Sequence, residues 1–198
     1  ICVIGRCSTT KDWLCWYRAW AQTDVIARRP QMVDKLMGFE EAGDLIVCED
    51  DDPTRDVRDI AQIAKQLNEA GLLPDESAVG LDAVGVVAII DALSGAGITD
   101  KQMKSVAQGY RLNGAVLGQE RKLKDGTLWH SGSGLMTWCV GNAKTEKRGN
   151  AVLITKEAAG VAKIDPLIAG FNAVHLMSLN PEASGGPSVY EERGIAMV

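Results

Sequence analysis

Two short apolar runs with alternating side chains open the chain and predict a β-hairpin. Residues 1–6 and 13–20 are rich in apolar and aromatic residues, and the polar stretch CSTTKD separates them. Successive side chains of a strand point to opposite faces, so an extended second run places Trp13, Cys15 and Tyr17 on one face. Aromatic side chains on a strand can stack on nucleic acid bases, but packing within a protein is their usual role.

Longer stretches with helical spacing alternate with further short apolar runs. Met32, Val33 and Leu36, for example, recur as on one face of a helix that Gly43 can end. The helices expected in this way cover residues 30–41, 54–70, 86–96, 112–124 and 166–177, and the one at 86–96 is apolar nearly all round, which predicts burial. Further strands are expected at 45–48, 78–82, 103–108 and 151–155. This alternation is typical of an α/β domain with a mixed β-sheet flanked by helices.

The stretch 149–177, GNAVLITKEAAGVAKIDPLIAGFNAVHLM, joins a β-rich run to an apolar helix that Pro166 opens. Asp165 therefore stands at a helix N-terminus, where an Asp before Pro can act as a structural N-cap. A second carboxylate, Asp82, ends the run AVGLD and precedes another helix. Two aspartates at element ends on a rigid scaffold can instead converge on a divalent cation, as metal-assisted phosphodiester cleavage requires.

Beyond Pro181 the sequence EASGGPSVYEERGIAMV loses periodicity and gains Gly and Pro. We expect one domain, residues 1–181, followed by a flexible C-terminal tail, residues 182–198. The chain begins with Ile1 and not with Met, so we expect it to be a piece of a longer protein.

Composition excludes some functions. The net charge of −5 argues against a stand-alone DNA-binding module, which usually carries a basic excess. The five cysteines form no CxxC pair and no finger-like spacing, so we expect reduced thiols in a cytosolic protein. The acidic run at 49–52 lacks the spacing of a calcium loop and is expected to be solvated. No stretch has the length of a membrane span, so we expect no membrane partner.

Three blocks of the sequence resemble the nuclease domain of bacteriophage and prophage large terminase subunits. The blocks are GLLPDESAVGLDAVGVVAIIDAL, SVAQGYRLNGAVLGQERKLKDGTLWHSGSGLMTWCVGNAK and RGNAVLITKEAAGVAKIDPLIAGFNAV. The resemblance implies a ribonuclease H-like α/β fold and an endonuclease that cuts concatemeric double-stranded viral DNA during packaging. Nothing in the chain resembles GxxxxGK[ST], so the ATPase motor of that family is expected outside it.

The resemblance assigns two metal-binding acids, Asp82 in GLD and Asp165 in KIDP. The third acid of the family lies on the strand that precedes the counterpart of residues 1–6, so both this ligand and the first strand of the sheet are missing from the numbered chain. Asp12 is the nearest substitute in sequence, although an Asp in a hairpin turn is usually exposed.

The mechanism implied by the resemblance is hydrolysis with two Mg²⁺ or Mn²⁺ ions roughly 4 Å apart. Lys156 and Lys163 flank the predicted site and could neutralise phosphate charge, although loop lysines are usually only solvated. His130 could approach the scissile phosphate or be structural, and Asn142 could lie at the rim of the site or simply form a turn.

Two other functions stay open at this point: a catalytically incomplete module for DNA docking or assembly, and another ribonuclease H-like nuclease such as a resolvase or transposase. The partners implied by the resemblance are double-stranded DNA, the terminase ATPase domain and small subunit, and the portal protein, which we expect to bind through the C-terminal tail. The location implied is the cytoplasm of the bacterial host.

Overall fold

A computed structural model describes residues 1–82, 86–156 and 163–185 of the chain. The strands are β1 (Cys2–Arg6), β2 (Trp13–Tyr17), β3 (Ala19–Gln22), β4 (Leu45–Cys48), β5 (Val79–Asp82), β6 (Met103–Val106), β7 (Leu128–His130), β8 (Ala143–Arg148) and β9 (Ala151–Lys156). The α-helices are α1 (Thr23–Ala27), α2 (Val33–Glu41), α3 (Arg55–Glu69), α4 (Val87–Gly95), α5 (Asn113–Lys124), α6 (Gly134–Gly141) and α7 (Asp165–Met177), with 3-10 turns at Pro30–Met32 and Gly109–Leu112. Parallel and antiparallel pairs both occur, so the predicted mixed α/β class is confirmed.

The predicted N-terminal hairpin is present, and β7 joins it to form the sheet β1-β2-β7. Trp13 and Cys15 are buried on one face, whereas Leu14 and Trp16 on the other face are exposed, as the alternation predicted. The second predicted strand ends earlier than expected, because β3 leaves the hairpin after Arg18 and pairs in parallel with β4. The apolar run at residues 13–20 therefore contributes strands to two sheets and not to one.

α3 and α4 pack together beside the parallel pair β5-β6, with Ala64, Leu93 and Ile98 buried between them. The prediction that the helix at 86–96 is buried all round is wrong, because Val87 is 72% exposed. α4 is covered on one side only, so its apolar composition does not make it a central helix.

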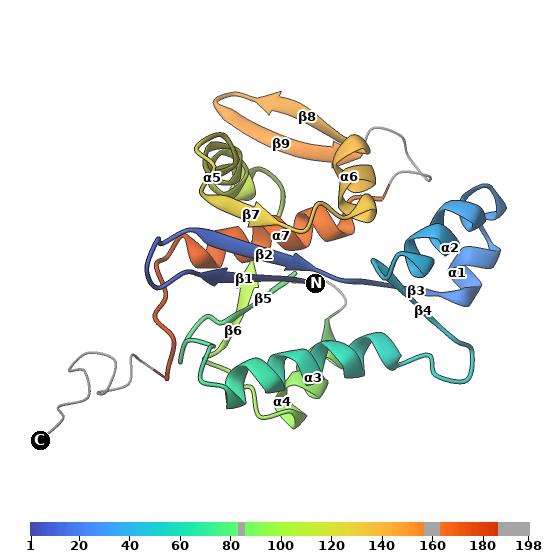
Figure 1. Ribbon diagram of the computed structural model, residues 1–198, viewed down its shortest axis with the longest axis horizontal. Coiled ribbons are helices and arrows are strands. Elements are labelled where there is room, and N and C mark those ends of the chain that lie inside the picture. Colours follow the sequence, from blue (N-terminus) through green and yellow to red (C-terminus); the bar gives the residue numbers. More distant parts are fainter. Residues whose placement is uncertain (83–85, 157–162, 186–198) are drawn as a thin grey trace, which may run out of the picture.

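α7 is the centre of the larger core. Leu167, Phe171 and Val174 are buried with residues of β2, β6, α5 and α6. Figure 1 shows α7 (orange to red) running along β1 and β2, with α5 and α6 on its other side. Gly170 permits this close approach, since a Cβ built on it would lie 2.8 Å from the Tyr17 hydroxyl oxygen.

Contacts at its two ends fix the direction of α7. After the C-terminal end of the helix, Arg6 donates to the side chain of Asn180 and to the carbonyl of Pro181, the latter over 2.8 Å. Arg6 pairs with Trp13 at the start of β2, whereas Gly170 lies against Tyr17 at its end. α7 is therefore antiparallel to β2, and its first residue projects beyond the Tyr17 end of that strand.

The expected single sheet is divided. Among the described residues there are four small sheets, and β1 pairs with β2 alone while β5 pairs with β6 alone. The hairpin β8-β9 was predicted only in its second strand, because the AKTEKR sequence of β8 is polar on both faces. A strand that is polar on both faces shows no alternation of apolar and polar residues, so apolar periodicity does not predict it.

The first tail residues lie against the domain. The backbone amides of Ser184 and Gly185 donate to the carbonyls of Leu73 and Gly71, over 3.0 and 2.9 Å. Residues 186–198 lie outside the described ranges, so the division into a domain and a tail stays a prediction. No helix within the described ranges is both long and apolar enough to cross a membrane.

Candidate functional site

Asp165 is exposed and is the first residue of α7, with Pro166 following it in the first turn. The capping interpretation is wrong in its position, because the N-cap is Ile164, whose side chain cannot accept a hydrogen bond. A carboxylate in the first turn is still stabilised by the partial positive charge of the helix N-terminus. Asp165 is thus a negative group held at a rigid element end, facing solvent.

Cys139 of α6 lies close enough to Asp165 to feel its charge. Burial raises the pKa of the Cys139 thiol to about 12, and the negative charge of Asp165 adds to the rise. The thiol has no exposed surface and stays protonated near neutral pH.

Asn142 and Lys163 are brought together beside Asp165. The Asn142 side-chain amide donates to the backbone carbonyl of Lys163 over 3.0 Å. This bond ties the end of α6 to the chain two residues before Asp165, so Asn142 positions the start of α7 and does more than form a turn. Lys156, exposed at the end of β9, pairs with Ala143 next to Asn142. The two lysines that the sequence singled out are therefore both linked to the end of α6, Lys163 through Asn142 and Lys156 through the neighbouring Ala143.

His130 is the last residue of β7 and lies on the same side of the domain as the start of α7. It pairs with Cys15 of β2, and β7 is parallel to β2, so the strand points toward the end beyond which Asp165 projects. His130 Nδ1 accepts a hydrogen bond from the Gly132 amide over 3.1 Å, which leaves Nε2 to carry the proton of the neutral ring. No carboxylate hydrogen bond to His130 is found among the described residues.

Asp82 reaches this side from a different layer. A Cβ built on Gly80 of β5 would lie 3.0 Å from both Leu176 of α7 and Val106 of β6. Two residues beyond Val106, Gln108 donates to the side chain of Asn172, which lies about one helical turn nearer the start of α7 than Leu176. β5 and β6 therefore run toward the N-terminus of α7, and Asp82 is the last and exposed residue of β5.

The pair Gln108 and Asn172 is a feature that the sequence analysis missed. Gln108 Nε2 donates to Asn172 Oδ1 over 3.0 Å and to the Val106 carbonyl over 2.9 Å, and Asn172 is 8% exposed. A buried amide in an otherwise apolar helix is the signal that points to such a pair. The pair fixes where the C-terminal end of β6, next to Asp82, lies along the axis of α7.

Asp12 lies at the opposite end of the domain. Its carboxylate accepts from Trp129 Nε1 over 3.2 Å, beside Trp13 at the start of β2. Asp165 projects beyond the other end of that strand, so Asp12 does not share a site with it. The acidic run at 49–52 is likewise engaged elsewhere, because Asp52 accepts from Arg58 and Asp50 from Thr23.

The acids that the structure brings to one side are Asp82 and Asp165. No group of three or more His, Cys, Asp or Glu side chains within the described ranges is close enough to hold a metal ion. Carboxylate oxygens suit Mg²⁺ and Mn²⁺, which bind proteins through one or two carboxylates together with water and phosphate. The two aspartates have the oxygen chemistry that suits such an ion, and no third acid within the described ranges lies close enough to complete a site with them.

Comparisons with known proteins agree with the arrangement of the elements. No family model matches the sequence, and no curated protein matches it significantly. Among solved structures, the chain is similar to the large terminase of bacteriophage HK97, with a TM-score of 0.66 and 16% sequence identity. The match covers 87% of this chain and 35% of that terminase, so the chain spans about a third of the length of the matched protein. The chain therefore has a terminase-like fold, similar to one part of the HK97 large terminase, as the sequence resemblance predicted.

Proposed function

We propose that this domain is a metal-dependent DNA endonuclease that cuts concatemeric double-stranded DNA for a viral packaging terminase. The observation that carries the proposal is the terminase-like fold in which one exposed aspartate, Asp82, ends β5 and another, Asp165, begins α7 on the same side of the domain. Rigid elements hold carboxylates more accurately than loops do, as a metal site requires.

The two aspartates would hold Mg²⁺ or Mn²⁺ together with a further ligand. When bound, the ions activate a water molecule and stabilise the leaving 3′-oxygen of the cut strand. The Asn142 contact to the Lys163 carbonyl would keep Asp165 in place.

Cationic groups near the aspartates would receive the DNA backbone. Lys163, two residues before Asp165, and Lys156, paired with Ala143 next to Asn142, would pair with phosphates. His130, with its Nε2 proton directed away from the Gly132 amide, would donate to a phosphate oxygen or to the attacking water. The remaining partners in this proposal are the terminase ATPase domain, the small subunit and the portal protein.

Nicking of supercoiled plasmid in Mn²⁺ tests the proposal. Asp82→Asn and Asp165→Asn each remove one negative charge at almost unchanged volume, and both are expected to abolish nicking while the circular dichroism spectrum stays the same. Asp12→Asn is the matched control, because it makes the same charge change at the other end of β2 and should cut like the parent protein. Wild-type nicking by either folded site variant would overturn the assignment of that residue as a required ligand.

A second candidate function is a DNA-docking or assembly module without catalysis. The incomplete ligand set within the described ranges favours it. Binding of duplex DNA in EDTA, with no cleavage in Mg²⁺ or Mn²⁺ by the parent protein, would support this function and contradict the endonuclease.

A further inference from the structure

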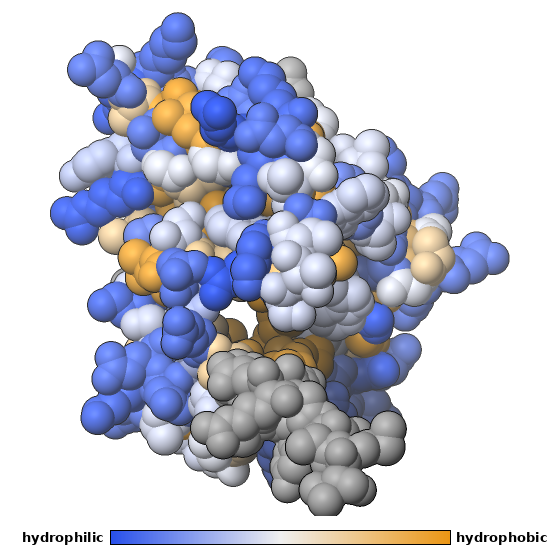
Figure 2. Space-filling model, turned by 60° about the vertical axis from the view of Figure 1, so that its left-hand side comes forward, coloured by the Kyte–Doolittle hydropathy of each residue, from blue (hydrophilic) through white to orange (hydrophobic). Residues whose placement is uncertain are grey.

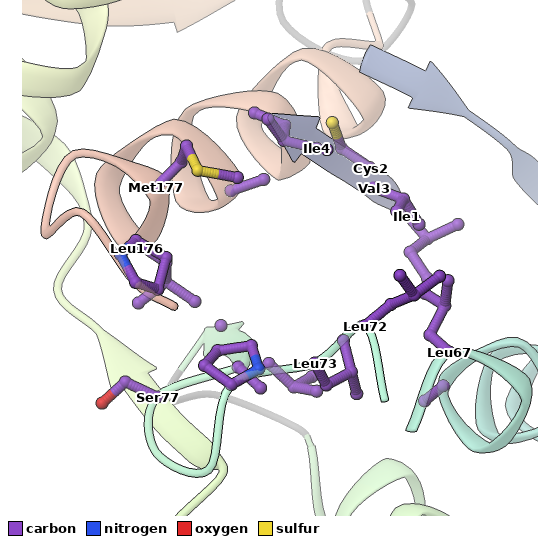
Figure 3. A pocket seen from close by; sticks show the side chains of 18 of the residues that line it. Ile1, Cys2, Val3, Ile4, Leu67, Leu72, Leu73, Ser77, Leu176 and Met177 are labelled. Carbon is purple, nitrogen blue, oxygen red and sulfur yellow. The ribbon is translucent and has the colours of Figure 1, made fainter. Parts of the chain in front are cut away.

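Two recesses adjoin β1, and they differ in chemistry. The first is an apolar cavity of about 440 Å³, and Figure 3 shows side chains of β1, of α7 and of the segment after α3 around it. In Figure 2 the surface is hollowed between two blocks of the molecule, with hydrophobic residues in the depth of the hollow. Asn172 is bonded to Gln108 and Arg6 to Pro181, so these polar side chains of the cavity are already engaged. Ligand sites usually direct several polar groups at the ligand, and the second recess does so.

The second recess, which we call the tryptophan groove, lies between strands β1–β4 and α3 and has a volume of about 540 Å³. Trp16, Arg18 and Trp20 line it, whereas Tyr17 and Ala19 between them pack against the larger core. Alternate residues of this stretch therefore point into the groove, as on one face of a strand. The other lining residues are Val3, Ile46, Asp59, Gln62, Ile63, Gln66 and Leu67.

Polar contacts hold both indole rings of the groove. The guanidinium carbon of Arg18 lies 5.2 Å from the centroid of the Trp16 ring, and Trp20 Nε1 donates to the Asp59 carboxylate over 3.0 Å. A guanidinium that stacks on an aromatic ring keeps its N–H edge for an anion. Arg18 forms no ion pair with any Asp or Glu of the described ranges, so its charge is open to a ligand.

α3 supplies two amide side chains without partners. Gln62 and Gln66 are exposed and one helical turn apart, and neither side chain is hydrogen-bonded within the part of the chain that the structure describes. Asp59, the one acid among the lining residues, also lies 3.5 Å from Arg55 Nε, which offsets its negative charge. An amide presents a donor and an acceptor together, the pattern that matches the edge of a nucleobase.

A nucleotide is the class of ligand that uses all of these groups. Indole faces stack on bases, a guanidinium binds phosphate, and amide side chains bind the edges of bases. A purely apolar ligand would leave the amides and the guanidinium unused. An added β-strand would need an open strand edge, whereas the strands present their side chains to this groove.

We propose that the tryptophan groove binds a nucleotide, with its base against the indole rings and its phosphate on Arg18. The base edge is bonded by Gln62 or Gln66. Trp16 and Trp20 are four residues apart, about 13 Å along an extended chain, so a strand with several bases can contact both rings. A free nucleotide and a nucleotide of single-stranded DNA present the same chemistry to these groups.

This inference goes beyond the endonuclease proposed above. Neither Asp82 nor Asp165 lines the groove, and the binding needs no metal ion. Fluorescence anisotropy of a labelled oligo(dA) of about six nucleotides, in EDTA, measures the binding without cleavage. Adenine is the base of choice because a Gln side chain can bind its N6 and N7 together.

Loss of one ring tests the stacking. Trp16→Leu should weaken binding of oligo(dA) about tenfold, because it removes one stacking surface. Trp129→Leu is the matched control, since Trp129 is 59% exposed on the same sheet and does not line the groove, and it should bind like the parent protein. Circular dichroism verifies the fold of both variants.

Loss of the guanidinium tests the phosphate contact. Arg18→Gln should weaken binding about tenfold and lower the slope of log K against log salt by about 0.7, the value of one phosphate contact on a single strand. Arg111→Gln is the matched control, because Arg111 also lies over an aromatic ring, Tyr110, and stands outside the groove. Gln66→Glu serves if the Trp16 and Arg18 variants do not fold, since this exposed change places a negative charge in the groove and should also weaken binding.

Competition separates the two sources of the nucleotide. Binding of dAMP in calorimetry as tight as that of oligo(dA) would indicate a free nucleotide, and binding of oligo(dA) alone would indicate single-stranded DNA. An abasic oligonucleotide of the same length carries the same charge without bases. Equal binding of this probe, no binding of either nucleotide probe, or equal losses in the groove variants and their controls would overturn the proposal. None of these measurements depends on DNA cleavage, so the groove and the endonuclease fail or succeed separately.

Discussion

Replacing Gly170 by Ala tests the close packing that sets the position of α7. A Cβ at this position would lie 2.8 Å from the Tyr17 hydroxyl oxygen and 3.2 Å from Tyr17 Cε1, so the ring or the helix must shift. Overpacking of this kind costs about 1–3 kcal/mol. The Ala also has a better helix propensity than Gly, which returns about 0.5–1 kcal/mol.

Gly118→Ala in α5 is the matched control, because nothing lies within 4 Å of a Cβ built there. It should stabilise the protein by the propensity gain alone, about 0.5–1 kcal/mol. The difference between the two variants is therefore the cost of overpacking, about 1–3 kcal/mol, or roughly 2–12 °C in melting temperature for a domain of this size.

Chemical denaturation monitored by tryptophan fluorescence measures both variants. Tyr17→Phe removes the oxygen of the 2.8 Å contact, so in a double-mutant cycle it should recover part of the Gly170→Ala loss. If Gly170→Ala proved as stabilising as Gly118→Ala, α7 would not be held against β2 as described.

Four further predictions follow, two on the thiols, one on the metal and one on the tail. Hydrogen bonds from the Thr10 side chain and from the Thr10 and Thr9 amides lower the pKa of Cys7, whereas burial and Asp165 raise that of Cys139 to about 12. Iodoacetamide at neutral pH should therefore modify Cys7 faster than Cys139 by peptide mass spectrometry, and equal rates would contradict this order. Because the Cys139 pKa is raised on folding, its contribution to stability is complete below the unfolded value of 9.0 and is lost as pH rises toward 12, which pH-dependent denaturation should show against Cys139→Ala. Calorimetry with Mg²⁺ should find only weak binding to Ile1–Val198, since two carboxylates hold this ion poorly without phosphate, and submicromolar affinity would show a fuller ligand set. Deleting residues 186–198 should leave the melting temperature and nicking unchanged but weaken binding to purified portal protein; deletion from residue 184 should also lower the melting temperature, because it removes two backbone bonds to Leu73 and Gly71. Unchanged portal binding would leave the tail without the proposed role.

Local sequence pattern predicts those elements in which one face is buried and the other is exposed. The alternation from Trp13 to Tyr17 gave the buried face of β2, and the apolar run after Pro166 gave α7, because burial of one face leaves a period in the sequence. It also indicated Asp82 and Asp165 as residues at element ends, and its resemblance to terminases predicted the fold. Local pattern did not reveal β8, whose residues are polar, or the exposure of α4, whose apolar surface is only partly covered.

Contacts between residues that are distant in the sequence become visible only in the folded protein. The contact of Asn142 with the Lys163 carbonyl, the pair of Gln108 with Asn172 and the approach of Cys139 to Asp165 each join segments 21 or more residues apart, and no spacing in the sequence encodes them. Asp12 was excluded from the site for the same reason, because the antiparallel course of α7 along β2 places it at the far end from Asp165. The direction of one element relative to another, and the distance between their residues, are set when the elements pack together. Sequence periodicity shows that a face is buried but not which element covers it.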